Sequence, residues 1–131
     1  MTALVDVLDH IVLTVRDVEA TVRFYERAFG MRGVTFGEGR RALAFGAQRI
    51  NLHPAGGEYD PHAAAPVPGS GDLCLLTSVP LDEVRAHHLD AVGVPVELGP
   101  VARTGAAGAL TSVYLRDPDG NLVEVANRVP G

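Results

Sequence analysis

Three residues of this chain carry chemistry that suits a metal ion, namely His10, His53 and Glu124. Two imidazoles and one carboxylate form the two-His-one-carboxylate set, which binds a divalent metal and leaves coordination positions open for substrate, oxygen or water. Each residue stands in a short alternating segment, which predicts that it lies on the strand face opposite the apolar side chains. An unpaired carboxylate is costly if that face is buried, and a shared cation removes the cost. Spacing alone nevertheless favours three independent surface or core residues, because nothing in the spacing proves that they converge.

Two passes of the same element order must position these residues. Alternating, β-branched residues predict a strand over 8–15, followed by a helix that Asp17 caps and Gly30 ends. Three strands are predicted next, over 32–36, 41–46 and 49–53. A second strand–helix pair then follows, over 72–78 and from Pro80 to Gly93. The last strands are predicted over 94–98, 110–116 and 122–126, with a tight turn at 117–121.

The two passes keep register, which predicts an internal repeat. Asp72 follows Asp9 by 63 positions, and Gly93 follows Gly30 by 63. Repetition at this scale predicts two copies of one unit around a shared core. We therefore expect an α+β fold of two βαβββ repeats in a single domain, 1–131. Repeat one covers about 6–54, a linker about 55–71 and repeat two about 72–127, with a flexible loop at 103–109.

Composition excludes several classes of function. The chain has 131 residues and a formal charge of −5, so it lacks the basic footprint of a nucleic-acid-binding protein. No apolar run approaches the roughly 20 residues of a membrane span. The first ten residues carry no mark of a signal peptide, so a cytoplasmic protein is expected. Cys74 lies in an apolar run and is expected to pack in the core.

Several motifs together resemble a known superfamily. They are LDHIVLTV at 8–15, RFYERAFGM at 23–31 and LRDPDGNLVEV at 115–125. With the repeated βαβββ order, they resemble the vicinal oxygen chelate superfamily over about residues 6–127. This group contains glyoxalase I, extradiol dioxygenases, fosfomycin-resistance proteins and bleomycin-binding proteins. INLHPAG at 50–56 further resembles the small branch called glyoxalase domain-containing protein 5-like.

The resemblance implies a cup-shaped mixed sheet that holds one divalent metal ion per site: Fe, Mn, Ni or Zn. In this superfamily the ligands come from the first and last strands of each unit, which implies His10, His53 and Glu124. The fourth family position aligns with Leu73 by the 63-residue offset. Because Leu cannot bind a hard cation, the resemblance implies a three-ligand site and argues against glyoxalase I itself. It implies a homodimer, whose sites are built within one chain or across two.

Further residues are candidates for substrate contact. Related enzymes place a Tyr or Arg near the final turn against the substrate oxyanion, which implies a catalytic role for Tyr114 and Arg116. A strand-surface Tyr and a solvated Arg remain the alternative. Arg41 and Arg103 are weaker candidates, since Arg41 begins a strand expected to face the cleft and Arg103 adjoins the flexible loop. His88 is expected to pack in the core.

The resemblance implies a metal-dependent enzyme with dioxygenase-like or lyase/isomerase-like chemistry on a small oxygen-chelating substrate. A metal-free antibiotic-binding protein is the alternative, and a dimer with a vestigial site is a third possibility.

Overall fold

The computed structural model describes residues 2–131 and forms two four-stranded mixed sheets. The elements are β1 (His10–Val15), α1 (Val18–Phe29), β2 (Arg32–Phe36), β3 (Arg40–Phe45), β4 (Gln48–Pro54), β5 (Asp72–Leu76), α2 (Leu81–Glu83), β6 (Leu98–Gly105), β7 (Gly108–Arg116) and β8 (Leu122–Arg128). The strand orders are β1-β4-β3-β2 and β5-β8-β7-β6, and β1–β4 and β5–β8 are parallel pairs. The repeated βαβββ fold predicted from the sequence is confirmed.

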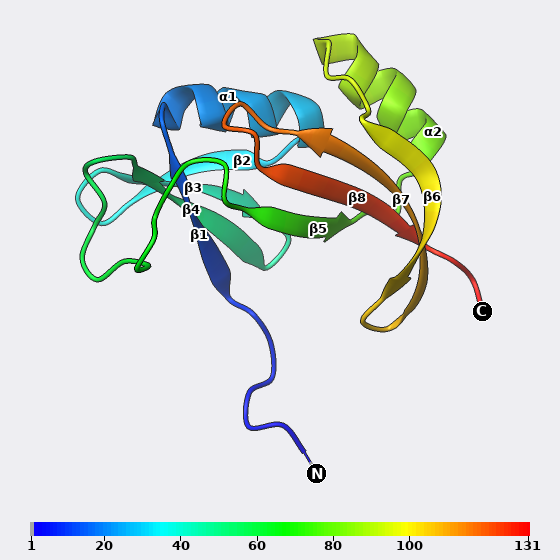
Figure 1. Cartoon of the computed structure of the whole chain (residues 1–131), viewed down its shortest axis with the longest axis horizontal. Coiled ribbons are helices and arrows are strands. Elements are labelled where there is room, and N and C mark those ends of the chain that lie inside the picture. Colours follow the sequence, from blue (N-terminus) through cyan, green and yellow to red (C-terminus); the bar gives the residue numbers. More distant parts are fainter. Residues whose placement is uncertain (1) are drawn as a thin grey trace.

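The helices lie on one side of both sheets and leave the other side open (Figure 1). Side chains beneath the helices form one continuous hydrophobic core that draws on both repeats, including Val15, Tyr25, Leu52, Leu115 and Val123. We call the opposite, open sides of the two sheets the first face (β1–β4) and the second face (β5–β8).

Local chemistry fixes the ends of α1 as predicted. The Asp17 carboxylate accepts a hydrogen bond from the Ala20 backbone N–H at 2.9 Å, which satisfies one free donor of the first turn. Gly30 ends the helix in the left-handed region with φ 67°, where a side chain would be strained.

The second helix differs from α1, because α2 continues as a π-helical turn over Val84–Leu89 and a 3-10 turn over Asp90–Val92. A π turn spaces residues by five, so it buries Leu89 next after Val84. His88, expected in the core from regular helical spacing, is only half-buried. That prediction was wrong because the wider turn rotates the helix face.

The two repeats are joined by a buried polar network at the turn that follows β7. The Tyr25 hydroxyl of α1 donates to the Asp117 carboxylate at 2.8 Å, and both side chains are buried. The Asn121 side-chain amide donates to Asp117 at 2.8 Å, and its oxygen accepts from the Gly71 N–H at 2.7 Å. Burial and the Asp117 charge raise the pKa of Tyr25 far above its ordinary value. This network, which we call the seam, fixes the orientation of β8 relative to α1.

Two sequence predictions in the second repeat were wrong. Residues 94–97 form no strand, and the expected flexible loop at 103–109 is a hairpin in which β6 pairs with β7 from Leu98 to Gly105. Only Ala106 and Ala107 stand between the paired glycines Gly105 and Gly108. The Gly- and Ala-rich composition therefore marks a tight turn.

The stretch before β1 projects away from the body (Figure 1), and its apolar residues Leu4, Val5, Val7 and Leu8 are exposed. Among residues 2–131, no helix is both long and apolar enough to cross a membrane.

Candidate functional site

The first face carries His10 and His53, as predicted, but it separates them along the sheet. In the β1–β4 register, His10 lies beside Arg49 and His53 lies beside Thr14. The two histidines are thus four residues apart along paired strands, or about 13 Å at roughly 3.3 Å per residue. Asn51 lies between them, beside Val12, and is the metal-competent side chain of β4 that lies nearer to His10.

His10 is oriented by its neighbour. Its Nδ1 lies 2.8 Å from an Asp9 carboxylate oxygen, and the side chains are 41% and 87% exposed. A histidine whose Nδ1 contacts a carboxylate presents its Nε2 in a fixed direction, which is how metal-binding histidines are commonly held.

His53 lies in a more enclosed position. Its ring meets the Tyr59 ring edge-on at 5.1 Å between centroids, and only 7% of the residue is exposed. Burial, reinforced by the Arg40 charge and by His62, lowers the pKa of His53. This environment keeps the imidazole neutral, the form that binds metals.

The second face carries Glu124 in the centre of its sheet. Glu124 is half-buried and lies opposite Tyr114 on β7 and Cys74 on β5. The Ser112 hydroxyl donates to its carboxylate at 2.6 Å, which holds the carboxylate in one orientation. Cys74 is exposed on this face, so its predicted core position was wrong. Partial desolvation and Glu124 raise the pKa of Cys74 to about 11.

Tyr114 and Arg116 share the second face but differ in availability. The Arg103 guanidinium donates from Nε to the Tyr114 hydroxyl at 2.8 Å, which leaves the phenolic hydrogen free to donate outward. Arg116 is held by Glu97 through contacts of 3.0 and 3.2 Å and donates to the Gly120 carbonyl. From the sequence, Arg103 was a weaker candidate for substrate contact than Arg116, yet it is Arg103 that contacts Tyr114.

Arg41, the other weak candidate, lies on the helix side of its sheet. Its guanidinium pairs with Glu19 of α1 through contacts of 3.0 and 3.2 Å. The expectation that it begins a strand facing the cleft was wrong by one residue, because Arg40 takes that face.

The residue at the fourth family position also differs by one from the residue expected from the sequence. Leu73 lies opposite Val123 and packs against the core, whereas Asp72 and Cys74 point to the second face. His10 begins β1 and Asp72 begins β5, so Asp72 is the structural counterpart of His10. The assignment of Leu73 was wrong, because a one-residue slip in a strand exchanges the two faces. Leu73 therefore does not exclude a four-ligand site.

Within one chain, these donors do not converge. Among residues 2–131, no group of three or more His, Cys, Asp or Glu side chains is placed to hold a metal ion. His53 lines a cavity of about 580 Å³ against the linker, whereas Asp72 and Glu124 line one of about 390 Å³ on the second face. The donor set is divided between two faces.

The residues present fit a divalent metal in chemistry, because each face supplies suitable donors. Two buried polar atoms of the first face, Asn51 Oδ1 and His53 Nδ1, have no hydrogen-bond partner within residues 2–131. An unsatisfied buried polar atom costs about 1–3 kcal/mol, and a bound cation would give the Asn51 oxygen a partner.

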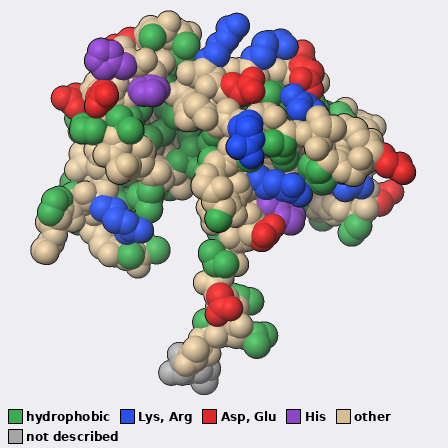
Figure 2. Space-filling model, turned by 180° about the vertical axis from the view of Figure 1, so that it is seen from behind, with side chains coloured by type: hydrophobic (Ala, Val, Ile, Leu, Met, Phe, Trp, Pro, Cys, Tyr) green, Lys and Arg blue, Asp and Glu red, His purple; other side chains and the backbone are tan. Residues whose placement is uncertain are grey.

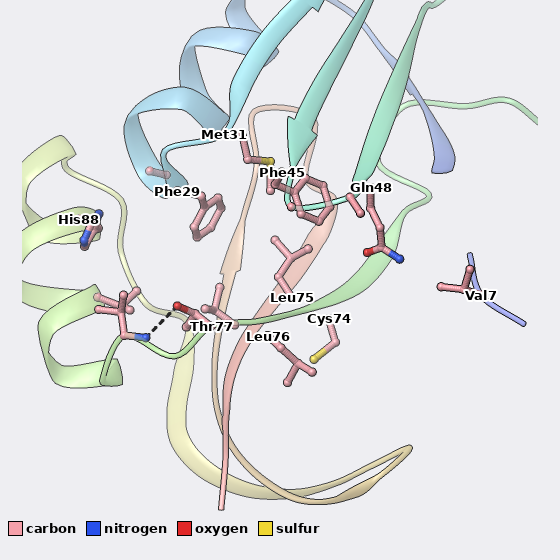
Figure 3. Close-up of a pocket in the computed structure, with 16 residues that line it drawn as sticks. Val7, Phe29, Met31, Phe45, Gln48, Cys74, Leu75, Leu76, Thr77 and His88 are labelled. Carbon is pink, nitrogen blue, oxygen red and sulfur yellow. Dashed lines mark hydrogen bonds between the residues drawn. The ribbon is translucent and has the colours of Figure 1, made fainter. Parts of the chain in front are cut away.

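A separate groove of about 600 Å³ lies where the two repeats meet. Phe29, Met31, Phe45 and Leu75 point into it from both repeats, with His88 and Cys74 towards its ends (Figure 3). The groove is mainly apolar and contains none of the candidate metal ligands.

Comparisons with known proteins define the family. The model of the Glyoxalase/Bleomycin resistance protein/Dioxygenase superfamily matches residues 7–125, so the chain belongs to this superfamily. Virulence protein STM3117 from Salmonella typhimurium is 51% identical over 96% of this chain and 87% of its own length. The match to the crystal structure of that protein covers 97% of this chain and 100% of the crystallised chain, with a TM-score of 0.93.

Two further relatives are similar. Glyoxalase domain-containing protein RDO1 from Mycosarcoma maydis is 48% identical over 92% of this chain and 67% of its own length. Integron cassette protein VCH_CASS1 from V. cholerae is 49% identical, covering 98% of this chain and 100% of its own, with a TM-score of 0.93. These names identify no reaction, and the glyoxalase domain-containing protein 5-like branch stays a prediction.

Proposed function

We propose that this chain is a divalent-metal-dependent enzyme whose site forms between the first face of one copy and the second face of another. One observation carries the proposal: the candidate donors are divided between two open faces of the same chain. The first face supplies imidazole and amide donors, and the second supplies carboxylates, of which Glu124 is held by Ser112. In a homodimer, each first face would meet the partner's second face.

The proposed ligands are His10, His53 and Glu124. The strand register adds Asp72, the counterpart of His10, and Asn51, which lies nearer to His10 than His53 does. Asn51 and His53 therefore compete for the position that β4 supplies, and variants of each can decide between them.

When bound, the metal would supply Lewis-acid polarisation of neighbouring oxygen atoms on a small substrate. Tyr114 would donate its phenolic hydrogen to a substrate oxygen, because Arg103 already occupies an acceptor position of that hydroxyl. The Ser112 hydroxyl would keep the Glu124 carboxylate in place. Such groups stabilise an oxyanion or enediolate, which is common to dioxygenase-like and lyase/isomerase-like reactions.

Equilibrium dialysis of the full chain against Fe(II), Mn(II), Ni(II) and Zn(II), followed by metal analysis, tests the proposal. We expect one ion per site, and affinity at least tenfold weaker in His10→Ala and Glu124→Gln than in the parent. A larger loss in Asn51→Ala than in His53→Ala would assign the β4 position to Asn51. A folded protein that binds no ion, or binds equally in His10→Ala and Glu124→Gln, contradicts it.

A mixing experiment tests the two-chain arrangement. A heterodimer of one His10→Ala chain and one Glu124→Ala chain retains one complete site, so metal binding should recover to half the parental stoichiometry. No recovery in a heterodimer confirmed by mass spectrometry would place each site within one chain.

The apolar groove favours a second candidate function, metal-free binding of an apolar small molecule. Its volume of about 600 Å³ falls within the usual range of ligand pockets. Saturable binding of Nile red that weakens in Phe45→Ala, in a protein that binds no metal, would support this alternative over the metalloenzyme.

A further inference from the structure

Arginine side chains gather around the base of the amino-terminal stretch, on the half of the molecule formed by the first repeat (Figure 2). Two arginines, Arg40 on β3 and Arg49 on β4, lie on the first face. Ala44 is the register partner of Arg49, and Ala42 is the partner of Asn51, so alternation places Arg40, Arg49 and Asn51 on the same side of the sheet.

Both guanidinium groups lie over aromatic rings. The Arg40 Cζ lies 4.2 Å from the centroid of the Tyr59 ring, and the Arg49 Cζ lies 4.1 Å from the centroid of the Phe36 ring. A stacked guanidinium is restricted in its rotamers while the N–H groups at its edge stay free to donate. Both side chains are half-buried, so their positions are prepared before a ligand arrives.

The two charges are brought towards the same end of the face. Phe36 is the register partner of Arg40, so the ring under the Arg49 guanidinium belongs to the same row of the sheet as Arg40. Arg49 itself begins beside Ala44, four positions along β3 from Arg40. Its side chain must cross the row of Ala42 to reach Phe36, which the small alanines permit.

Neither guanidinium has a carboxylate within 4.0 Å in the part of the chain that the structure describes. The neighbouring Arg41 shows the contrast, since it points to the helix side and is paired with Glu19. Two unpaired cations directed to the same region repel each other, and an anion placed between them offsets this cost. The chain as a whole is acidic, with 16 Asp and Glu against 11 Arg and Lys, so a shortage of carboxylates does not explain the unpaired arginines.

We propose that Arg40 and Arg49 form a binding site for an oxyanion, the carboxylate, phosphate or phosphonate group of the ligand. Arginine matches such groups with two parallel N–H···O bonds. The site rests on the proposed function only in assigning its ligand as the substrate, which would be acidic and would place its anionic group on the first face. Anion binding itself requires no metal.

Isothermal titration calorimetry with inorganic phosphate, on full-length protein dialysed against chelator, tests the proposal at constant ionic strength. We expect saturable binding that weakens about tenfold in Arg40→Met and in Arg49→Met, because each loses a charge-assisted hydrogen-bond pair. Arg85→Met removes an exposed charge from the second helix and serves as the matched control. Arg40→Lys retains the charge but loses the planar fork, so it should bind more weakly than the parent.

Binding that does not saturate, or that falls equally in Arg85→Met and Arg40→Met, overturns the proposal. Circular dichroism and melting temperature identify a variant that fails to fold, and Arg40→Lys then replaces Arg40→Met. Metal dialysis on the same variants separates this proposal from the proposed function. His10→Ala should lose metal and keep phosphate binding, whereas Arg40→Met should show the reverse.

Discussion

The two repeats share one scaffold but present different chemistry on their open faces. The first face carries His10, Asn51 and the stacked arginines, whereas the second carries Asp72, Glu124 and the Tyr114 hydroxyl. His10 and Asp72 begin equivalent strands, so the same backbone position holds an imidazole in one repeat and a carboxylate in the other. The difference teaches that duplication of a fold need not duplicate its chemistry.

Breaking the seam that joins the repeats should give the largest loss of stability. Asp117→Ala leaves the Tyr25 hydroxyl, the Asn121 amide and two backbone N–H groups without their acceptor. We expect the free energy of unfolding to fall by about 4 kcal/mol, since breaking a buried charged network costs 3–5 kcal/mol. Urea denaturation measures it. A loss below about 1 kcal/mol would show that the repeats do not depend on the seam.

The second helix offers the next comparison, between the neighbouring residues Leu89 and His88. Leu89 is fully buried by the π-helical turn, and Leu89→Ala should cost about 3 kcal/mol in unfolding free energy. His88→Ala is the matched control and should cost under about 1 kcal/mol, because His88 is only half-buried. Equal losses, measured by thermal denaturation, would mean that the helix buries His88 as regular spacing suggests.

Tyr25 gives a smaller effect with a pH dependence of its own. Tyr25→Phe removes one hydrogen bond to a buried carboxylate and should cost about 1.5 kcal/mol. The folded chain keeps the Tyr25 proton, and the unfolded chain loses it near the ordinary pKa of 10.0. The contribution is therefore complete below pH 10 and decreases as pH rises, by up to about 1.4 kcal/mol per pH unit. Denaturation of parent and Tyr25→Phe between pH 9 and 11 should show curves that converge, and parallel curves would contradict this.

The smallest change in stability is expected from Arg41 on the helix side of the first sheet, which can be compared with Arg40 on the first face. Arg41 pairs with a Glu19 side chain that is 57% exposed, so Arg41→Met should cost only about 0.5 kcal/mol. Its neighbour Arg40 has no such partner within residues 2–131, so only Arg40→Met should alter phosphate binding. Phosphate binding that falls in Arg41→Met as well would remove the distinction between the two sides.

The sequence predicted the architecture well because its signals were local. The Asp17 cap, the Gly30 stop and the tight turn at 117–121 each act within a few residues, and the structure has all three. The hairpin at Gly105 was missed because its sequence has no apolar alternation, although a glycine on each side of two residues was the available signal.

The site was harder to predict because it depends on register. The glycines that end the two helices, Gly30 and Gly93, are 63 positions apart, whereas His10 and Asp72 are 62 positions apart. Because of this difference of one residue, the offset of 63 pointed to Leu73 instead of Asp72. No spacing rule shows that Arg49 reaches across Ala42 to Phe36, or that Tyr59 lies against both His53 and Arg40. Such contacts depend on side chains from three strands and the linker.

The linker between the repeats is held by a hydrogen bond at each end. The Ala55 N–H bonds to the Val15 carbonyl, and the Gly71 N–H bonds to the buried Asn121 side chain. Because the ends are already held together, doubling the length of the intervening loop would add only about 0.6 kcal/mol of closure entropy. Ala64, exposed in the middle of this loop and absent from the lining of the His53 cavity, is therefore a site where this chain can accept an inserted peptide or a label.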